Sequence, residues 1–150
     1  MNEPKETVLI SACLMGVSCQ YNGKNKCHAH LNQLMEKVTL IPVCPEILGG
    51  MPTPRDPSER LGDRVVTKTG QDVTEAFGKG AAETLRLAKL YGCRLAVLKQ
   101  RSPSCGSGSI YDGSFTGTVI PGYGVTAALL EKNGIHVMDE SELDSLLEKK

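Results

Sequence analysis

The feature that most constrains the fold is a set of short, largely apolar runs separated by segments of helical periodicity. Four such runs predict strands, over Thr7–Ala12, Val38–Val43, Arg94–Leu98 and Ile135–Met138. Their apolar residues follow one another instead of alternating with polar ones, which is typical of strands covered on both faces in a parallel sheet. We therefore expect an α/β protein, with a three-layer Rossmann-like fold and a mostly parallel sheet.

Apolar residues at helical spacing predict what connects these strands. The expected helices span residues 28–37, 73–91 and 123–132. Asp72 and Glu75 form a capping-box pattern at the start of the second helix, and Gly92 suits a left-handed cap at its end. After the last strand, Asp139 with Glu142 predicts the start of a final helix. That helix would carry Leu143, Leu146 and Leu147.

The stretch from Pro45 to Arg64 is interrupted so often by proline and glycine that we expect neither a helix nor a central strand there. A loop of this length inside a compact domain is more often functional than accidental. Just beyond it, Arg64–Thr67 and Gln71–Val73 predict a small β-hairpin insertion. The length of 150 residues suits a single domain over residues 1–150.

Charge and hydropathy exclude several classes of partner. Seventeen basic residues balance seventeen acidic ones, so the overall charge gives no support for binding a nucleic-acid polymer. No run approaches the ~20 apolar residues of a membrane span, and residues 1–7 lack the apolar region of a signal peptide. We expect a cytoplasmic protein that acts without a membrane. The sequence does not indicate an oligomeric state.

Three of the six cysteines each follow a predicted strand: Cys13, Cys44 and Cys105. Because the carboxyl ends of parallel strands lie along one edge of a sheet, we expect these thiols to converge there. In a reducing compartment so many cysteines favour metal, cluster or redox use, although a free cysteine is also often a small buried hydrophobe. Three thiolates without an evident fourth suit a cubane iron–sulfur cluster with one iron left open to bind substrate.

Other assignments of the thiols stay open. Cys19 lies in the same loop as Cys13 and competes with it as the first ligand. A zinc site is the second interpretation, and it would use Cys13, Cys19, Cys27 and Cys44. That arrangement would assign no functional role to Cys105 and its loop. Cys93 directly precedes a buried strand, so we expect it to be structural.

Groups suited to proton transfer lie beside these cysteines. Glu46 comes two positions after Cys44, and a carboxylate in a partly dry site exchanges protons near neutral pH. Capping of the following turn is an equal alternative for Glu46. Ser102 and Ser104 precede Cys105 and offer hydroxyl groups that bind or protonate a substrate atom.

Two arginines complete the set of candidate substrate-binding residues. Arg55 and Arg101 supply planar forks of N–H donors for a carbonyl or an anion. The alternative is that either arginine pairs at the surface with Asp56 or Glu59.

Five sequence blocks, in order, resemble the thiouracil desulfidase family in its short, single-domain form, formerly a domain of unknown function. The blocks are Ser-Ala-Cys-Leu-Met-Gly, Val-Cys-Pro-Glu-Ile-Leu-Gly-Gly-Met-Pro-Thr-Pro-Arg, Asp-Val-Thr, Arg-Ser-Pro-Ser-Cys-Gly and Gly-Val-Thr-Ala-Ala-Leu-Leu. The resemblance runs from about Val8 to Ile135. The first loop departs from the family, which often has Cys-Arg-Tyr-Asp-Gly where this chain has neutral amides at Gln20 and Asn22.

The resemblance implies a [4Fe–4S] cluster with three cysteine ligands and one open iron, the ligands falling on Cys13, Cys44 and Cys105. The thiocarbonyl sulfur of a thiolated uracil would bind the open iron, and water would replace it at the ring carbon, with release of hydrogen sulfide. Glu46 matches the acid/base glutamate of the family and Ser102 its substrate-contacting serine. Two other hypotheses remain: a non-catalytic iron–sulfur or sulfide carrier, and a zinc or redox thiol protein.

Overall fold

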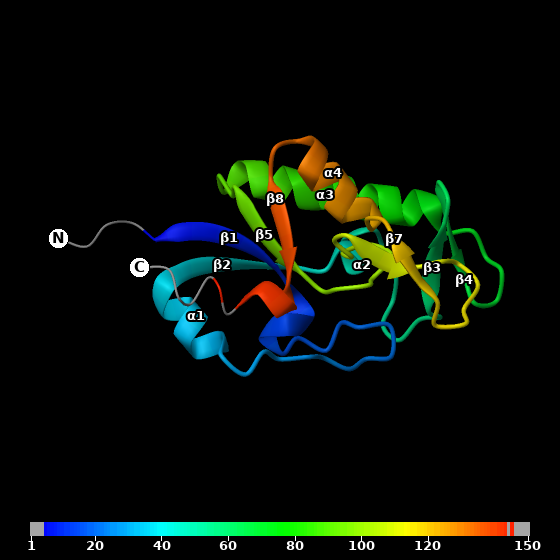
Figure 1. Ribbon diagram of the computed structural model, residues 1–150, viewed down its shortest axis with the longest axis horizontal. Helices are drawn as coiled ribbons and strands as arrows, with labels where there is room; N and C mark the ends of the chain where they lie inside the picture. The colour runs from blue at the N-terminus through cyan, green and yellow to red at the C-terminus, as the bar shows by residue number, and fades with distance from the viewer. Residues whose placement is uncertain (1–4, 144, 146–150) are drawn as a thin grey trace.

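The computed structural model describes residues 5–143 and residue 145, and its centre is a four-stranded sheet (Figure 1). The strands are β1 (Glu6–Ser11), β2 (Val38–Val43), β5 (Leu95–Leu98) and β8 (His136–Asp139). All neighbours are parallel, in the order β2-β1-β5-β8. The predicted strands and the α/β class are confirmed.

Helices cover both faces of this sheet, as predicted for a three-layer fold. α1 (Leu31–Lys37) lies on one face, and α3 (Thr74–Leu90) and α4 (Val125–Lys132) lie on the other (Figure 1). Successive residues of β1 point to opposite faces. Ile10 therefore packs in the core layer that contains Leu34 of α1, whereas Leu9 packs in the layer that contains Leu130 of α4.

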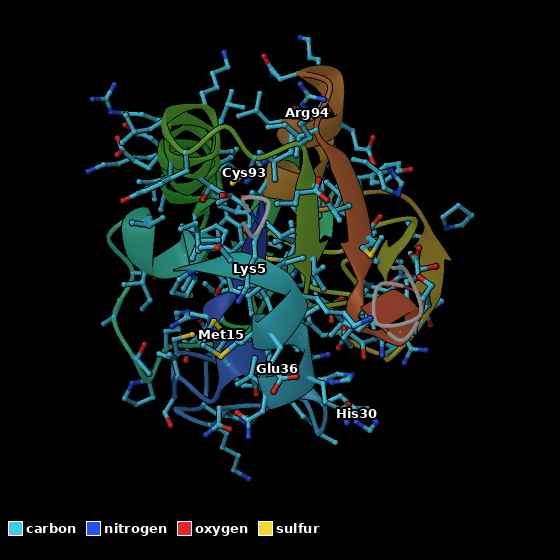
Figure 2. All side chains as sticks on the ribbon, turned by 90° about the vertical axis from the view of Figure 1, so that its left-hand side faces the viewer. Lys5, Met15, His30, Glu36, Cys93 and Arg94 are labelled. Carbon is cyan, nitrogen blue, oxygen red and sulfur yellow. The ribbon has the colours of Figure 1, made fainter. Side chains whose placement is uncertain are left out.

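Figure 2 views the sheet end-on, so that the side chains on its two faces appear separately. Figure 2 shows Cys93 on the side of α3, with Met15 and Glu36 on the side of α1. Cys93 is buried in the same layer as Ala88 of α3, as expected for a structural cysteine. Within the described part of the chain, no helix combines the length and the apolar character needed to cross a membrane.

The region predicted as a loop differs from expectation in its first turn. A short helix, α2 (Pro45–Leu48), begins immediately after Cys44. Proline is tolerated at the first helical position because its missing N–H would have no partner there. The frequency of proline and glycine in this stretch therefore limits the length of the helix and does not prevent it.

A hairpin insertion is present, but one of its predicted strands was wrong. β3 (Ser58–Leu61) pairs with β4 (Arg64–Thr67), whereas Gln71–Val73 contributes only an isolated bridge to Val66. The connection Gly62-Asp63 has a positive φ at Gly62, which suits a two-residue hairpin turn. The predicted turn at 68–70 instead leads the chain towards α3.

A second hairpin escaped prediction. It pairs β6 (Ser109–Tyr111) with β7 (Val119–Pro121). These strands are too short to show a periodic pattern. A short 3₁₀ helix also escaped prediction, η1 (Ala12–Met15) directly after β1.

The predicted helix ends are partly confirmed. Gly92 adopts a left-handed conformation at the end of α3, as expected. The capping box is wrong: Asp72 accepts a hydrogen bond of 2.9 Å from the Thr74 N–H, but Val73 occupies the cap position and has no side-chain cap. At the other end of the chain, the Asp139 carboxylate accepts from the Ser141 N–H at 2.8 Å.

The last predicted helix is described only at its start. Glu140–Glu142 forms η2, and Leu143 is buried against the layer of α1. Leu146 and Leu147 lie outside the described residues.

The short helix α2 is held against α3 by two glycines. A Cβ atom on Gly80 of α3 would lie 1.8 Å from the Pro45 carbonyl oxygen, and one on Gly49 would lie 2.1 Å from the Ala76 carbonyl oxygen. Only glycine permits backbones to approach this closely. The approach fixes α2, and with it Glu46, at the carboxyl end of β2.

A candidate iron–sulfur and substrate pocket

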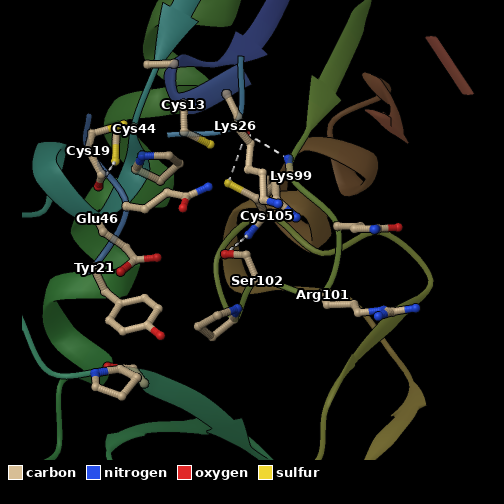
Figure 3. Close-up of a pocket in the computed structure, with 18 of the residues that line it drawn as sticks. Cys13, Cys19, Tyr21, Lys26, Cys44, Glu46, Lys99, Arg101, Ser102 and Cys105 are labelled. Atoms are coloured by element: carbon tan, nitrogen blue, oxygen red, sulfur yellow. Dashed lines mark hydrogen bonds between the residues drawn. The ribbon is translucent and has the colours of Figure 1, made fainter. Parts of the chain in front are cut away.

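A pocket of about 480 Å³ lies at the carboxyl ends of β1, β2 and β5. Four thiols line it: Cys13, Cys19, Cys44 and Cys105 (Figure 3). Loops after β1 and β5 lead to helices on opposite faces of the sheet, so the two strands border a switch point of the kind where α/β proteins bind ligands. The structure therefore brings together the three cysteines expected to converge, and adds Cys19.

Each thiol is placed by the element that follows its strand. Cys13 lies on η1 directly after β1, and Cys44 precedes the first residue of α2. Cys105 lies in the loop after β5, where its sulfur accepts a hydrogen bond of 3.5 Å from the Ser11 hydroxyl. All six cysteines of the chain are free thiols.

Hydrogen bonds between the thiols divide them into two kinds. The Cys19 thiol lowers the pKa of Cys13 and lowers that of Cys44 to about 6, while its own pKa is raised by the same contacts. Burial raises the pKa of Cys105 to about 12. Near neutral pH, the metal-free chain therefore holds negative charge at Cys44 and protons at Cys19 and Cys105, while the lowered pKa of Cys13 favours its thiolate.

This donor set fits an iron–sulfur cluster in its chemistry, because such clusters are held by soft thiolate ligands. Cluster ligands each bind a different iron, so they need not meet at a single point. In the described ranges, no three His, Cys, Asp or Glu side chains are arranged to hold one metal ion. Cys27 is exposed and does not line the pocket, so the four thiols of the alternative zinc site are not brought together.

Glu46 lines the pocket from the first turn of α2, and its partner is Arg55. The Arg55 Nε donates a hydrogen bond of 2.9 Å to Glu46 Oε1. The pairings of Arg55 with Asp56 or Glu59 are therefore wrong. Glu59 instead accepts hydrogen bonds from the second hairpin. In the described structure, the Glu46 carboxylate accepts no hydrogen bond from a backbone N–H of its own turn, which leaves the capping alternative without support.

The two predicted serines have different surroundings. Ser102 lines the pocket, and its Oγ accepts hydrogen bonds of 3.1 Å from the backbone N–H groups of Ser104 and Cys105. Ser104 is only 1% exposed and lies outside the pocket lining, because its hydroxyl bonds that of Thr126 at 2.9 Å. The structure does not bring Ser104 to the site.

Arg101 lies at the rim of the pocket and is exposed. Its side chain extends away from the thiols (Figure 3). Its φ of 63° places it in the left-handed region, and a single bridge to Ile110 joins it to the second hairpin. In the described structure no hydrogen bond or ion pair is found for its guanidinium.

Comparison with known proteins agrees with this geometry. Residues 8–142 match the family model described as 2-thiouracil desulfurase. The chain belongs to the 2-thiouracil desulfurase family. The resemblance drawn from the sequence is thereby confirmed.

Two relatives extend the match over nearly the full length. The uncharacterized protein YbbK of Bacillus subtilis (strain 168) is 43% identical over 150 residues, which is 93% of this chain and 99% of the relative. The solved structure of TudS, a [4Fe-4S]-dependent thiouracil desulfidase, is 46% identical and covers 95% of each chain, with a TM-score of 0.90.

This member of the 2-thiouracil desulfurase family has pocket residues that the sequence analysis missed. Lys99 follows β5 at the same edge as Cys105, and its ammonium group pairs with Glu140 at 3.0 Å. Tyr21 and Tyr111 line the wall as the aromatic side chains of the pocket. The position of Lys99 directly after a strand was a usable signal, whereas Tyr111 is brought in by the hairpin that escaped prediction.

Proposed function

We propose that this protein is a [4Fe–4S]-dependent desulfidase that replaces the thiocarbonyl sulfur of thiolated uracil-type bases with oxygen. The overall reaction joins water and the thiocarbonyl compound to give the carbonyl compound and hydrogen sulfide, without a net change in electrons. The observation that carries the proposal is the convergence of three strand-end thiols on the pocket that also contains Glu46.

Cys13, Cys44 and Cys105 would hold the cluster, leaving one iron without a protein ligand. When bound, the cluster supplies a Lewis-acidic iron that draws electron density from the C–S bond. We leave Cys19 out of this set because its pKa is raised by its hydrogen bonds with Cys13 and Cys44, whereas the pKa of each of those two thiols is lowered. Metal ligation requires thiolates, and two of the three proposed ligands already have a lowered pKa.

Glu46 is the proposed acid/base group. Its side chain is 17% exposed at the pocket wall, and its carboxylate is held on one oxygen by Arg55. An ionised carboxylate takes a proton from water as the water oxygen attacks the ring carbon. The same group then returns that proton to the departing sulfur, and the second proton of the water leaves the new hydroxyl as the carbonyl forms and completes hydrogen sulfide.

Ser102 is the proposed substrate-orienting group. Its oxygen already accepts two backbone hydrogen bonds, so the hydroxyl hydrogen remains available for donation into the pocket. Donation to a ring carbonyl or nitrogen would fix the orientation of a pyrimidine. The pocket volume of about 480 Å³ falls in the range of small-ligand sites, which suits a single base as substrate.

The test is anaerobic reconstitution with iron and sulfide, followed by incubation with 2-thiouracil. We expect hydrogen sulfide and uracil in equal amounts over many turnovers. Cluster-loaded wild-type protein that releases no sulfide from any thiolated pyrimidine would contradict the proposal. Glu46→Gln separates an enzyme from a sulfide carrier: we expect a fall in kcat on the order of 10²- to 10³-fold with the iron content unchanged.

A further inference from the structure

Arg55 makes more hydrogen bonds at the pocket than its sequence context suggests. Its guanidinium donates four: Nε to Glu46 Oε1 at 2.9 Å, Nη2 to the Cys19 carbonyl at 2.9 Å, and Nη1 to the Pro52 carbonyl and Thr53 Oγ1, both at 3.0 Å. These acceptors belong to the loop after β1, the helix after β2 and the loop of Arg55 itself. One side chain therefore joins three segments around the pocket.

The burial of this arginine explains why it needs so many partners. Its side chain is only 4% exposed, and a buried cation is costly unless it is paired and hydrogen-bonded. A guanidinium has five N–H donors, so the four bonds leave little capacity for a substrate. The expectation that Arg55 binds substrate directly is therefore not the role its contacts favour.

The carboxylate that faces Arg55 is held on one side only. Glu46 Oε1 accepts the Arg55 bond, and within the described structure Oε2 has no hydrogen-bond partner. Figure 3 shows the Glu46 carboxylate directed into the pocket, on the wall opposite Ser102. The remaining oxygen is therefore available to a water molecule or a substrate atom.

We infer that Arg55 is a positioning residue that acts through Glu46. Its bonds to the Cys19 and Pro52 carbonyls and to Thr53 fix the guanidinium, which in turn fixes Glu46 with one oxygen turned to the attacking water. The inference rests on the proposed function, because it assigns Glu46 the proton-transfer role. It adds a residue of the pocket lining that acts on the rate through the position of Glu46 and not through substrate binding.

The test compares Arg55→Met and Arg55→Lys with wild-type protein after anaerobic loading. We expect kcat for 2-thiouracil to fall on the order of 30-fold in Arg55→Met, because a misplaced catalytic group reduces the rate without weakening binding. KM and the iron content should stay within about twofold of wild type. Arg55→Lys should keep an intermediate kcat, since an ammonium group can reach Glu46 but cannot hold the Cys19 carbonyl as well.

Arg60→Met is the matched control. Arg60 also donates to two backbone carbonyls, those of Gly62 and Tyr123, but it lies outside the pocket. We expect its kcat to equal that of wild type. A rise in KM in Arg55→Met with kcat unchanged would show direct substrate binding and overturn the inference.

A double-mutant cycle tests whether Arg55 acts through Glu46. In Glu46→Asp the shorter side chain no longer reaches Arg55, so adding Arg55→Met should reduce kcat by less than about twofold. A full 30-fold loss in that background would overturn the inference while leaving the proposed function intact. Absence of sulfide release from loaded wild type would instead contradict the proposed function.

A structural measurement is independent of the cluster. A crystal structure of metal-free Arg55→Met should show the Glu46 carboxylate displaced from the pocket wall. An unchanged carboxylate would overturn the inference even if the rate fell.

Discussion

Ser11 and Cys105 are 94 residues apart in the chain, and the Ser11 hydroxyl donates a hydrogen bond of 3.5 Å to the Cys105 sulfur. The same hydroxyl oxygen accepts the Lys99 N–H at 2.9 Å. One small side chain therefore joins the end of β1 to the loop after β5. It also opposes the effect of burial on Cys105, because its hydrogen bond lowers the pKa of that thiol.

Ser11→Ala should weaken the hold on the cluster. Without the hydroxyl, the pKa of Cys105 rises further and its thiolate becomes a poorer ligand, so loaded protein should lose iron faster to a chelator. The free energy of unfolding should fall by about 1–2 kcal/mol. Ser107→Ala is the control, because Ser107 also donates one hydrogen bond, to the Val137 carbonyl, but does not contact a pocket thiol. Equal rates of iron loss in the two variants would contradict this role for Ser11.

Single serine substitutions should identify the ligands. We expect Cys13→Ser, Cys44→Ser and Cys105→Ser each to abolish the brown colour and most bound iron, because serine is a poor ligand for iron–sulfur clusters. Cys19→Ser should keep both, and Cys27→Ser serves as the exposed control. The measurement is iron and acid-labile sulfide per chain after anaerobic reconstitution. Loss of iron in Cys19→Ser with retention in Cys13→Ser would make Cys19 the first ligand.

The sheet and the meeting of the thiols were predictable because both follow from chain direction. Apolar runs such as Val38–Val43 show a strand without any tertiary information, and parallel strands necessarily place their following residues at one edge. Cys44 and Cys105 could therefore be brought to one pocket from their positions alone. The short strands of the second hairpin, in contrast, carry no periodicity and depend on packing against their neighbours.

The partners of individual side chains were not predictable. Arg55 had acidic neighbours in the sequence, yet it bonds Glu46 because the intervening loop folds back on α2. Ser104 lies in the same tripeptide as Ser102, but one turns its hydroxyl to Thr126 and the other lines the pocket. The difference between the two serines depends on the packing of α4 against the loop after β5, which no local sequence pattern encodes.

Cys44 should be the most reactive proposed ligand in the metal-free chain. Its pKa of about 6 makes it mostly thiolate at pH 7, so alkylation by iodoacetamide should be near its maximum there. The rate should halve near pH 6 and then fall about tenfold for each further pH unit. Mass spectrometry of each cysteine gives the rates. Cys105, with a pKa of about 12, should stay unmodified, and Cys19→Ala should slow the reaction of Cys44 by removing its hydrogen bond.

Ser104→Ala should reduce stability without changing the chemistry. The substitution leaves the buried Thr126 hydroxyl without its partner, which costs about 1–3 kcal/mol. Denaturant unfolding measures this loss, and kcat and KM per loaded cluster should match wild type. Adding Thr126→Val should recover part of the stability, because both polar groups are then removed. A higher KM in Ser104→Ala would show that this serine does contact the substrate.

Gly80→Ala tests whether the contact between α2 and α3 positions the site. Alanine normally stabilises a helix relative to glycine by about 1 kcal/mol, but here its Cβ would lie 1.8 Å from the Pro45 carbonyl oxygen. The clash should reduce the free energy of unfolding by about 1–3 kcal/mol and displace α2, which carries Glu46. We therefore expect a lower kcat as well as a lower denaturation midpoint. Gly78→Ala, in the same helix, is the control: nothing lies within 4 Å of its Cβ position, so it should be as stable as wild type or more so, with unchanged kcat. If Gly80→Ala had the same stability and kcat as Gly78→Ala, the close contact between α2 and α3 would not be needed for activity. Arg55 would then be sufficient to position Glu46.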